Sequence, residues 1–207
     1  MASVHSDQPM VDNEPTPTSL DATAIKILVS GGFGVGKTTM IGSVSEIPPL
    51  RTEETITEAS KGVDDLAGLE GKTTTTVALD FGRITINPDL VVYLFGTPGQ
   101  DRFWFMWDEL ARGAVGAIIL IDTRRLETSF SAIDFFERRD LPFIVAVNMF
   151  FGECGYQADE IRAALKLGPL VPLVWCDARD RYTCKRALIK LVQHAMARLQ
   201  ANTSSAV

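Results

Sequence analysis

The sequence predicts an α/β fold of the doubly wound kind, in which a mostly parallel, six-stranded sheet carries about five helices on its two faces. Apolar runs rich in β-branched residues alternate with segments whose apolar residues recur every three or four positions, as in amphipathic helices. The 207 residues are 46% hydrophobic, which suits one domain with a buried core. We expect this domain at residues 23–200, between disordered tails at 1–22 and 201–207 whose small and polar residues bury little surface.

The individual elements follow from local patterns. The expected strands lie at residues 25–29, 73–86, 90–95, 117–121, 143–147 and 170–175. The clearest helix is 182–200, and further helical segments are expected at 39–46 and 126–139. Residues 47–72 are rich in Thr and Glu, contain glycine and proline, and lack a clear period. A connection of this length predicts a functional or mobile loop.

The composition argues against several function classes. The formal net charge of -6 provides no basic surface for nucleic acid. The longest apolar run, 114–121, is far shorter than the roughly 18 residues of a membrane span, so we expect no direct membrane insertion. The N-terminus lacks the features of a signal peptide, which predicts a cytoplasmic protein. The cysteines, which number three and form no CxxC pair, are expected to be free thiols: Cys154, Cys176 and Cys184.

A phosphate-binding motif follows the first expected strand. Residues 31–38 read GGFGVGKT and fit the pattern GxxxxGK[ST], with a strand before and a helical segment after. Backbone N–H groups of such a loop bind phosphate at a helix N-terminus, where the helix dipole favours an anion. Lys37 is expected to bridge the β and γ phosphates, and Thr38 to offer its hydroxyl to Mg²⁺. The other expected nucleotide-binding residues of this motif are Gly31, Phe33, Gly34, Val35, Gly36 and Thr39.

With the segments TTTTVALDFGR, LFGTPGQ and CDARDR, the chain resembles the Ras-like small GTPases, and most of all their bacterial branch of MglA-like and actinobacterial conservon GTPases. The resemblance covers about residues 24–200. It implies a small G domain acting as a cytoplasmic molecular switch, which binds GTP or GDP with Mg²⁺ and hydrolyses GTP slowly. It also implies a small roadblock-type regulatory protein and a sensor-kinase complex as partners, which can recruit the chain to a membrane surface.

The resemblance assigns roles to further residues. Thr76 corresponds to the magnesium-binding threonine of the first switch, with Thr75 as the alternative, and residues 47–72 correspond to that switch. Gly99 would give its N–H to the γ phosphate, and Gln100 would orient the attacking water. The expected catalytic residues are therefore Lys37, Thr76 and Gln100, and the expected metal ligands are Thr38 and Thr76.

The expected base-binding residues depart from the family pattern. The motif NKxD appears as residues 148–151, NMFF, which keeps Asn148 and loses the aspartate that reads guanine. Glu153 or Asp177 are the candidate substitutes, so the preference for guanine over adenine stays open. The last motif corresponds to Asp177, Ala178 and Arg179, where the Ala178 N–H would meet guanine O6 and the Arg179 stem would cover the base. The alternative is a plain loop with a helix-capping acid.

Two other departures bear on catalysis. Gly96 replaces the aspartate that holds magnesium through water, which predicts weaker metal binding. Phe33 places a ring near the γ phosphate, which predicts slow hydrolysis. Among nearby arginines, a role in cis at the phosphates is open for Arg51, Arg83 and Arg102, although solvated or ion-paired side chains are the more common outcome.

Two alternative functions remain open at this stage. The first is a nucleotide-binding module without significant hydrolysis, in the manner of a pseudo-GTPase, and the second is a P-loop ATPase or kinase. The aromatic run at 103–107 cannot face inward throughout on one helix, so we also expect an exposed partner site there.

Overall fold

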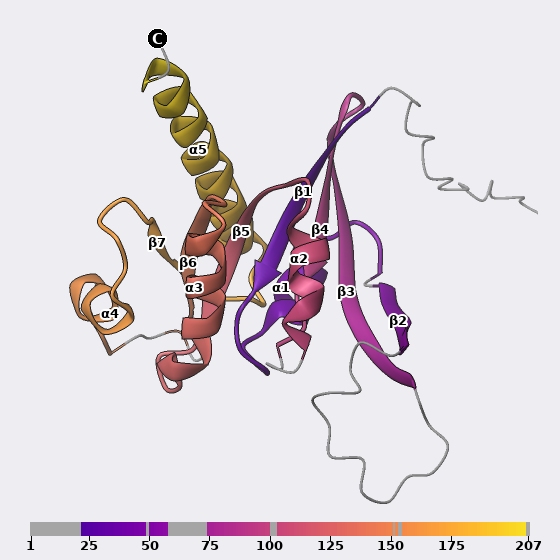
Figure 1. Ribbon diagram of the computed structural model, residues 1–207, viewed down its shortest axis with the longest axis horizontal. Helices are drawn as coiled ribbons and strands as arrows, with labels where there is room; N and C mark the ends of the chain where they lie inside the picture. Colours follow the sequence, from indigo (N-terminus) through magenta and orange to yellow (C-terminus); the bar gives the residue numbers. More distant parts are fainter. Residues whose placement is uncertain are drawn as a thin grey trace, which may run out of the picture.

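A seven-stranded sheet in the order β2-β3-β4-β1-β5-β6-β7 forms the centre of the molecule (Figure 1). The computed structural model describes residues 22–48, 50–57, 74–99, 103–150, 152 and 155–205. The strands are β1 (Thr23–Ser30), β2 (Leu50–Thr57), β3 (Thr74–Asn87), β4 (Leu90–Gly96), β5 (Ala114–Ile121), β6 (Phe143–Asn148) and β7 (Leu173–Cys176). Strands β1, β4, β5, β6 and β7 are parallel, whereas β3 pairs antiparallel with both β2 and β4.

Helices cover both faces of this sheet. The described helices are α1 (Lys37–Val44), α2 (Phe105–Ala111), the 3-10 helix η2 (Leu126–Ser129), α3 (Phe130–Arg138), α4 (Ala158–Leu165) and α5 (Arg181–Ser205). Buried side chains of α1 and α5 form one core with the sheet, and those of α2, α3 and α4 form the other. Strand β1 contributes Ile27 and Val29 to the first core and Leu28 to the second, which explains its continuous apolar run. The doubly wound α/β class is confirmed.

The sheet contains one strand more than the six expected, all of which are present. Strand β2 lies within residues 47–72, where the sequence predicted a loop. Its residues pair with β3 from Leu50 opposite Phe81 to Thr57 opposite Thr74. Pairing at the sheet edge therefore forms this strand, although its sequence lacks an alternating apolar pattern.

The two ends of the chain differ in how much of each the structure describes. The expected tail at 1–22 lies outside the described residues except for its last residue. At the other end, α5 continues to Ser205 through residues expected in the C-terminal tail. The hydroxyls of Thr203 and Ser204 donate to the carbonyls of Leu199 and Gln200, which supports these last turns. None of the helices described here combines the length and the apolar composition that a membrane span requires.

The strand order places a binding site at the carboxyl end of β1. Strand β1 has β4 on one side and β5 on the other, and both of these come later in the chain. Ligands of doubly wound sheets bind in the crevice where the strand order reverses in this way. The GGFGVGKT loop leaves β1 at this point and leads directly into α1.

Candidate functional site

The loop at 31–36 has the backbone geometry of an anion cradle. Gly31, Gly34 and Gly36 have φ values of 127, 74 and 107°, a region that other residues rarely adopt. Gly36 precedes the first residue of α1, and its carbonyl accepts the N–H of Met40 at 2.8 Å. The N–H groups at the start of α1 and the dipole of this helix therefore favour a phosphate group here.

Lys37 lies inside the loop that it serves. Its Nζ donates to the carbonyls of Gly31 and Gly32, both at 2.8 Å, and the residue is buried. Burial lowers the pKa of this ammonium to about 8, and the charge of Asp80 opposes the shift. A buried cation held by neutral carbonyls is suited to exchange them for the stronger contacts of a phosphate.

A carboxylate from β3 meets the hydroxyl of Thr38. Thr38 Oγ1 donates to Asp80 Oδ2 at 2.5 Å. A β-carbon built at Gly96 would lie 3.0 Å from the Asp80 β-carbon and 3.2 Å from its Oδ2. Asp80 thus occupies the space beside Gly96, where the family pattern has an aspartate. Asp80 is not among the site residues expected from the sequence, because its contact with Thr38 joins segments that are distant in the chain.

The loop after β4 closes the other side of the cradle. A β-carbon at Gly99 would lie only 2.5 Å from Lys37 Nζ and 2.9 Å from the Phe33 nitrogen, so a side chain there would displace both. The open cavity between these segments has a volume of about 410 Å³. It is lined by Phe33, Gly34, Gly36, Lys37, Thr38, Thr39, Asp80, Thr97, Pro98 and Gly99.

The structure describes one of the other two expected catalytic residues. Gln100 lies outside the described residues. Thr76 lies in β3 opposite Thr55 of β2. At a strand rise of about 3.3 Å per residue, the four residues that separate Thr76 from Asp80 span about 13 Å. Thr76 is therefore separated along β3 from Asp80, the residue that meets Thr38, and its expected metal role stays a prediction.

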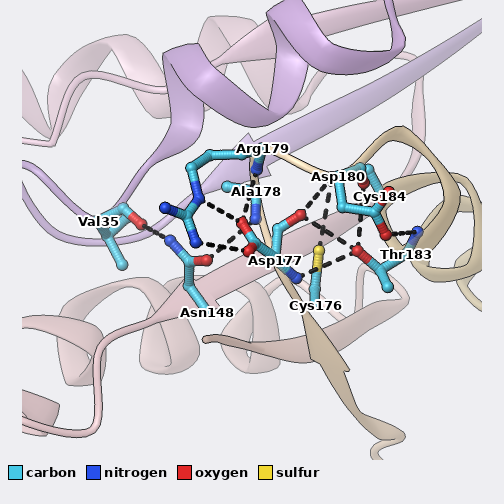
Figure 2. A network of polar contacts seen from close by, with 9 residues as sticks. All are labelled: Val35, Asn148, Cys176, Asp177, Ala178, Arg179, Asp180, Thr183 and Cys184. Atoms are coloured by element: carbon cyan, nitrogen blue, oxygen red, sulfur yellow. Dashed lines mark hydrogen bonds and ion pairs between the residues drawn. The ribbon is translucent and has the colours of Figure 1, made fainter. Parts of the chain in front are cut away.

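The expected base-binding residues form one hydrogen-bonded network (Figure 2). Asn148, at the end of β6, donates Nδ2 to the Val35 carbonyl at 2.8 Å and accepts the Ala178 N–H at Oδ1 at 3.1 Å. It therefore ties the phosphate loop to the segment after β7. Because the Ala178 N–H donates to Asn148, it is not free to bind a nucleotide base in this arrangement.

Arg179 folds back onto Asp177. Its Nε and Nη2 donate to the two carboxylate oxygens of Asp177 at 2.9 and 2.7 Å. These bonds hold the pKa of Asp177 below its ordinary value. The helix-capping acid is Asp180, whose side chain accepts the N–H groups of Tyr182 and Thr183 at the start of α5. Asp177 is thus not the cap, and its charge is taken up by Arg179.

Two buried thiols lie beneath this segment. Cys176 and Cys184 are free, with their sulfurs 3.6 Å apart, and Cys184 Sγ donates to the Asp177 carbonyl at 3.3 Å. Of the other residues expected near the base, Phe151 and Glu153 lie outside the described residues, as does Cys154.

The arginines considered for a role in cis are placed as follows. Arg83 forms an ion pair with Glu46 at 3.2 Å. Arg51 lies in β2, where only the backbone is described, and Arg102 lies outside the described residues. In the aromatic run, Trp107 donates Nε1 to the Pro98 carbonyl and is buried, whereas Trp104 is 59% exposed. The expected exposure within this run is confirmed, and its use as a partner site stays a prediction.

A family of known proteins matches most of this chain. Residues 29–198 match a protein family described as "Conserved hypothetical ATP binding protein". The chain belongs to this family. It is also 29% identical over 126 residues to the uncharacterised protein MJ1339 of Methanocaldococcus jannaschii, a match that covers 60% of this chain and 69% of that protein.

Solved structures of similar fold include G domains of the FeoB iron transporter. The cytosolic domain of the T. maritima protein has a TM-score of 0.59 at 16% identity, covering 84% of this chain. This chain covers 64% of the length of that cytosolic domain. The isolated G domains from T. maritima and Methanococcus jannaschii have TM-scores of 0.55 and 0.53, at 17% and 13% identity, and are covered to 99% and 98%. At these identities the likeness establishes the fold of a P-loop G domain.

Proposed function

We propose that this chain is a nucleotide-dependent molecular switch, which binds a nucleoside triphosphate with Mg²⁺ and hydrolyses it slowly to the diphosphate and phosphate. The observation that carries the proposal is the cavity at the carboxyl end of β1, in which Lys37, Thr38, Asp80 and Gly99 surround the cradle of the phosphate loop. The fold and the family description support nucleotide binding.

The oxygen donors beside the loop fit a hard divalent cation. The Thr38 hydroxyl and the Asp80 carboxylate lie 2.5 Å apart, and Mg²⁺ prefers such oxygen ligands. Thr38 would hold the ion directly and Asp80 would hold it through water. When bound, the ion would neutralise charge on the β and γ phosphates. Asp80 would thus supply the carboxylate that is missing at Gly96, and the expectation of weaker metal binding stays a prediction to be measured.

The chain's own residues would act on the phosphates and on water. Lys37 would leave the carbonyls of Gly31 and Gly32 for the β and γ phosphates, and the Gly99 N–H would bind the γ phosphate. Gln100 would orient the attacking water, and Thr76 would sense the γ phosphate if β3 rearranges. These contacts differ between triphosphate and diphosphate states, which is what a switch requires.

A second candidate function is an ATPase, and one observation favours it. Asp177 is paired with Arg179, and the Ala178 N–H is paired with Asn148, so neither is free to read guanine in this arrangement. The family description as ATP binding agrees with this candidate. The resemblance to Ras-like proteins favours GTP. A binding module without hydrolysis remains the third outcome that an activity measurement can give.

The partner surface proposed for the switch includes Trp104. Its neighbour Trp107 bonds to Pro98, directly before Gly99, so α2 is linked to the segment that would bind the γ phosphate. A small roadblock-type protein and a sensor kinase are the partners that the resemblance implies. Binding of such a partner should depend on the nucleotide and weaken in Trp104→Ala.

Two measurements test the proposed function. The nucleotide released on denaturing the purified protein identifies GTP, GDP or their adenine counterparts. Phosphate release with Mg²⁺ and protein in excess over GTP or ATP then decides whether hydrolysis occurs. Lys37→Ala should abolish binding while leaving the fold stable, and Lys185→Ala, an exposed residue of α5, is the matched control. Normal nucleotide binding by Lys37→Ala contradicts the proposal.

A further inference from the structure

Two arginines follow β5 at the edge of the phosphate loop, and the first of them is fully engaged. Arg124 donates Nε and Nη2 to the two carboxylate oxygens of the buried Asp122, each at 2.8 Å. These bonds hold the pKa of Asp122 below its ordinary value. The Arg124 guanidinium also lies 4.4 Å from the ring centre of Phe150. Its charge is therefore balanced by Asp122 and its position is fixed.

Arg125 is held more loosely and points to the phosphate loop. Its Nη2 lies 3.6 Å from Asp122 Oδ2 and donates to the Phe33 carbonyl at 3.4 Å. The side chain is 48% exposed. Because Arg124 already makes the close contacts with Asp122, the charge of Arg125 is less fully compensated. A guanidinium with a long contact to a neutral carbonyl gains most from a nearby anion.

The backbone that carries Arg125 is packed on the same loop. The Arg125 N–H donates to the Asp122 carbonyl, and Thr128 Oγ1 donates to the Arg125 carbonyl, both at 2.9 Å. A β-carbon at Gly32 would lie 2.4 Å from Thr128 Oγ1, so this segment lies directly against the phosphate loop. The Arg125 side chain thus starts from an anchored position.

Arg125 also lies beside Gly34 of the phosphate loop. A β-carbon at Gly34 would have Arg125 Nη2 as a neighbour at 3.7 Å, and Gly34 lines the cavity of the proposed nucleotide site. The guanidinium therefore lies beside Phe33 and Gly34, two residues that line this cavity. Because the side chain is half-exposed, it has room to turn toward an anion bound there.

We propose that Arg125 is a catalytic arginine in cis, which leaves the Phe33 carbonyl when nucleotide binds and pairs with oxygens of the β and γ phosphates. The inference rests on the proposed function. In hydrolysis the water oxygen forms a bond to the γ phosphorus while the bond to the β–γ bridging oxygen breaks. The leaving diphosphate takes that electron pair, and the proton of the water passes to the phosphate product. Arg125 gives up no proton and stabilises the developing charge by hydrogen bonds.

The test compares Arg125→Ala and Arg125→Lys with Arg138→Ala, a control on α3 whose side chain is exposed and bonds to Asp134. Phosphate release is measured with protein in excess over GTP and over ATP. We expect Arg125→Ala to be slower by about 10- to 100-fold, because related proteins with an arginine in cis work near 10⁻² per second and those without one at about 10⁻⁴ to 10⁻³. Arg125→Lys should recover little, free guanidinium ion should partly rescue Arg125→Ala, and Arg138→Ala should match the wild type.

Binding of the diphosphate together with aluminium fluoride, which mimics the transferring phosphoryl group, is the second readout. Arg125→Ala should weaken this complex about 10-fold or more while changing affinity for the diphosphate alone by less than about threefold. Equal losses for both ligands, without guanidinium rescue, would indicate a structural role and overturn the inference. A rate and an aluminium fluoride affinity unchanged from wild type overturn it as well.

Failure of the proposed function can be distinguished from failure of the role proposed for Arg125. Wild-type protein that releases no phosphate from either nucleotide refutes hydrolysis by this chain. In that case, binding of a non-hydrolysable triphosphate analogue tests the contact between Arg125 and the phosphates. Arg125→Ala must then lower the protein's affinity for the analogue more than its affinity for the diphosphate. If Arg125→Ala changes the affinities for the analogue and for the diphosphate by the same factor, the contact is overturned too.

Discussion

Asp80 and Gly96 lie side by side on neighbouring strands, and the carboxylate of the one occupies the space that a side chain on the other would take. The β-carbon of an alanine at position 96 would stand 3.2 Å from Asp80 Oδ2. An aspartate at 96 and an aspartate at 80 therefore compete for the same place beside Thr38. The chain keeps the acid on β3 and glycine on β4, which preserves one carboxylate at the cavity.

The position of the Asp80 carboxylate beside Thr38 predicts the effect of removing its negative charge. We expect Asp80→Asn to weaken Mg²⁺ binding by the nucleotide complex about 10- to 100-fold, because an amide replaces the carboxylate that would hold the ion's water. A magnesium titration of the release of a fluorescent nucleotide measures it. Asp89→Asn, in the exposed turn between β3 and β4, is the control.

The double variant Asp80→Gly with Gly96→Asp sharpens the same test, since it moves the acid to the neighbouring strand. It should recover magnesium binding relative to Asp80→Gly alone. If Asp80→Asn binds magnesium as tightly as the wild type, Asp80 has no part in holding the ion.

Burial of Lys37 predicts how nucleotide affinity depends on pH. Its pKa of about 8 in the unliganded protein lies below the ordinary 10.5, because burial disfavours the charged form. Phosphates require the ammonium, so above pH 8 binding must take up a proton. We expect affinity to fall by up to about tenfold per pH unit there. Calorimetry in buffers of different ionisation enthalpy measures that uptake.

The lowered pKa of Lys37 has the opposite effect on the stability of the unliganded protein, which rises with pH where nucleotide affinity falls. Between pH 8 and 10.5 the unfolded chain binds more protons at Lys37 than the folded one, so this group's contribution to unliganded stability rises with pH. Lys26→Met is the control for both effects, because the pKa of Lys26 is also lowered by burial but its Nζ donates to the Arg112 carbonyl, outside the residues that line the cavity. Proton uptake that disappears in Lys26→Met, or that is absent in wild type, would contradict the assignment.

The pairing of Arg179 with Asp177 predicts a route to base selectivity. Arg179→Ala should free the Asp177 carboxylate to accept the two donors of guanine, a contact that adenine cannot make. The ratio of GTP to ATP affinity should then rise by about 10-fold or more. Competition binding measures this ratio, with Arg186→Ala on the exposed face of α5 as the control. An unchanged ratio in Arg179→Ala, together with a rise in Phe151→Asp, would move the base-reading position to residue 151.

Local spacing predicted the parts of the site that lie close together in the chain. The cradle from Gly31 to Thr38 could be identified because its glycines, lysine and threonine act within one loop and the first turn of α1. The six expected strands could be identified for the same reason, since five of them carry their own apolar run and the strand at 73–86 shows an alternating pattern.

The remaining features depend on contacts between distant segments. Thr38 and Asp80 are 42 residues apart, and nothing in the local pattern of either residue indicates their hydrogen bond. Strand β2 forms by pairing with β3 at the sheet edge, and its own residues resemble a loop. Likewise, Arg125 is one of several arginines in sequence, and contacts between distant segments place it at the phosphate loop, namely Thr128 with Gly32 and Arg125 with Phe33.

The last prediction concerns the two residues that flank the expected position of the γ phosphate. Phe33 is 67% exposed and lines the cavity, and we expect its ring to crowd the water that Gln100 would orient. Phe33→Gly should therefore accelerate hydrolysis a few-fold, whereas Gln100→Leu should slow it by about 10-fold or more, because an apolar side chain cannot hold the nucleophile. Single-turnover phosphate release measures both, and nucleotide affinity, which should change little, serves as the internal control. The two rates must move in opposite directions. Two variants that both hydrolyse at the wild-type rate would mean that neither side chain stands at the γ phosphate, and would favour a binding module over a hydrolytic switch.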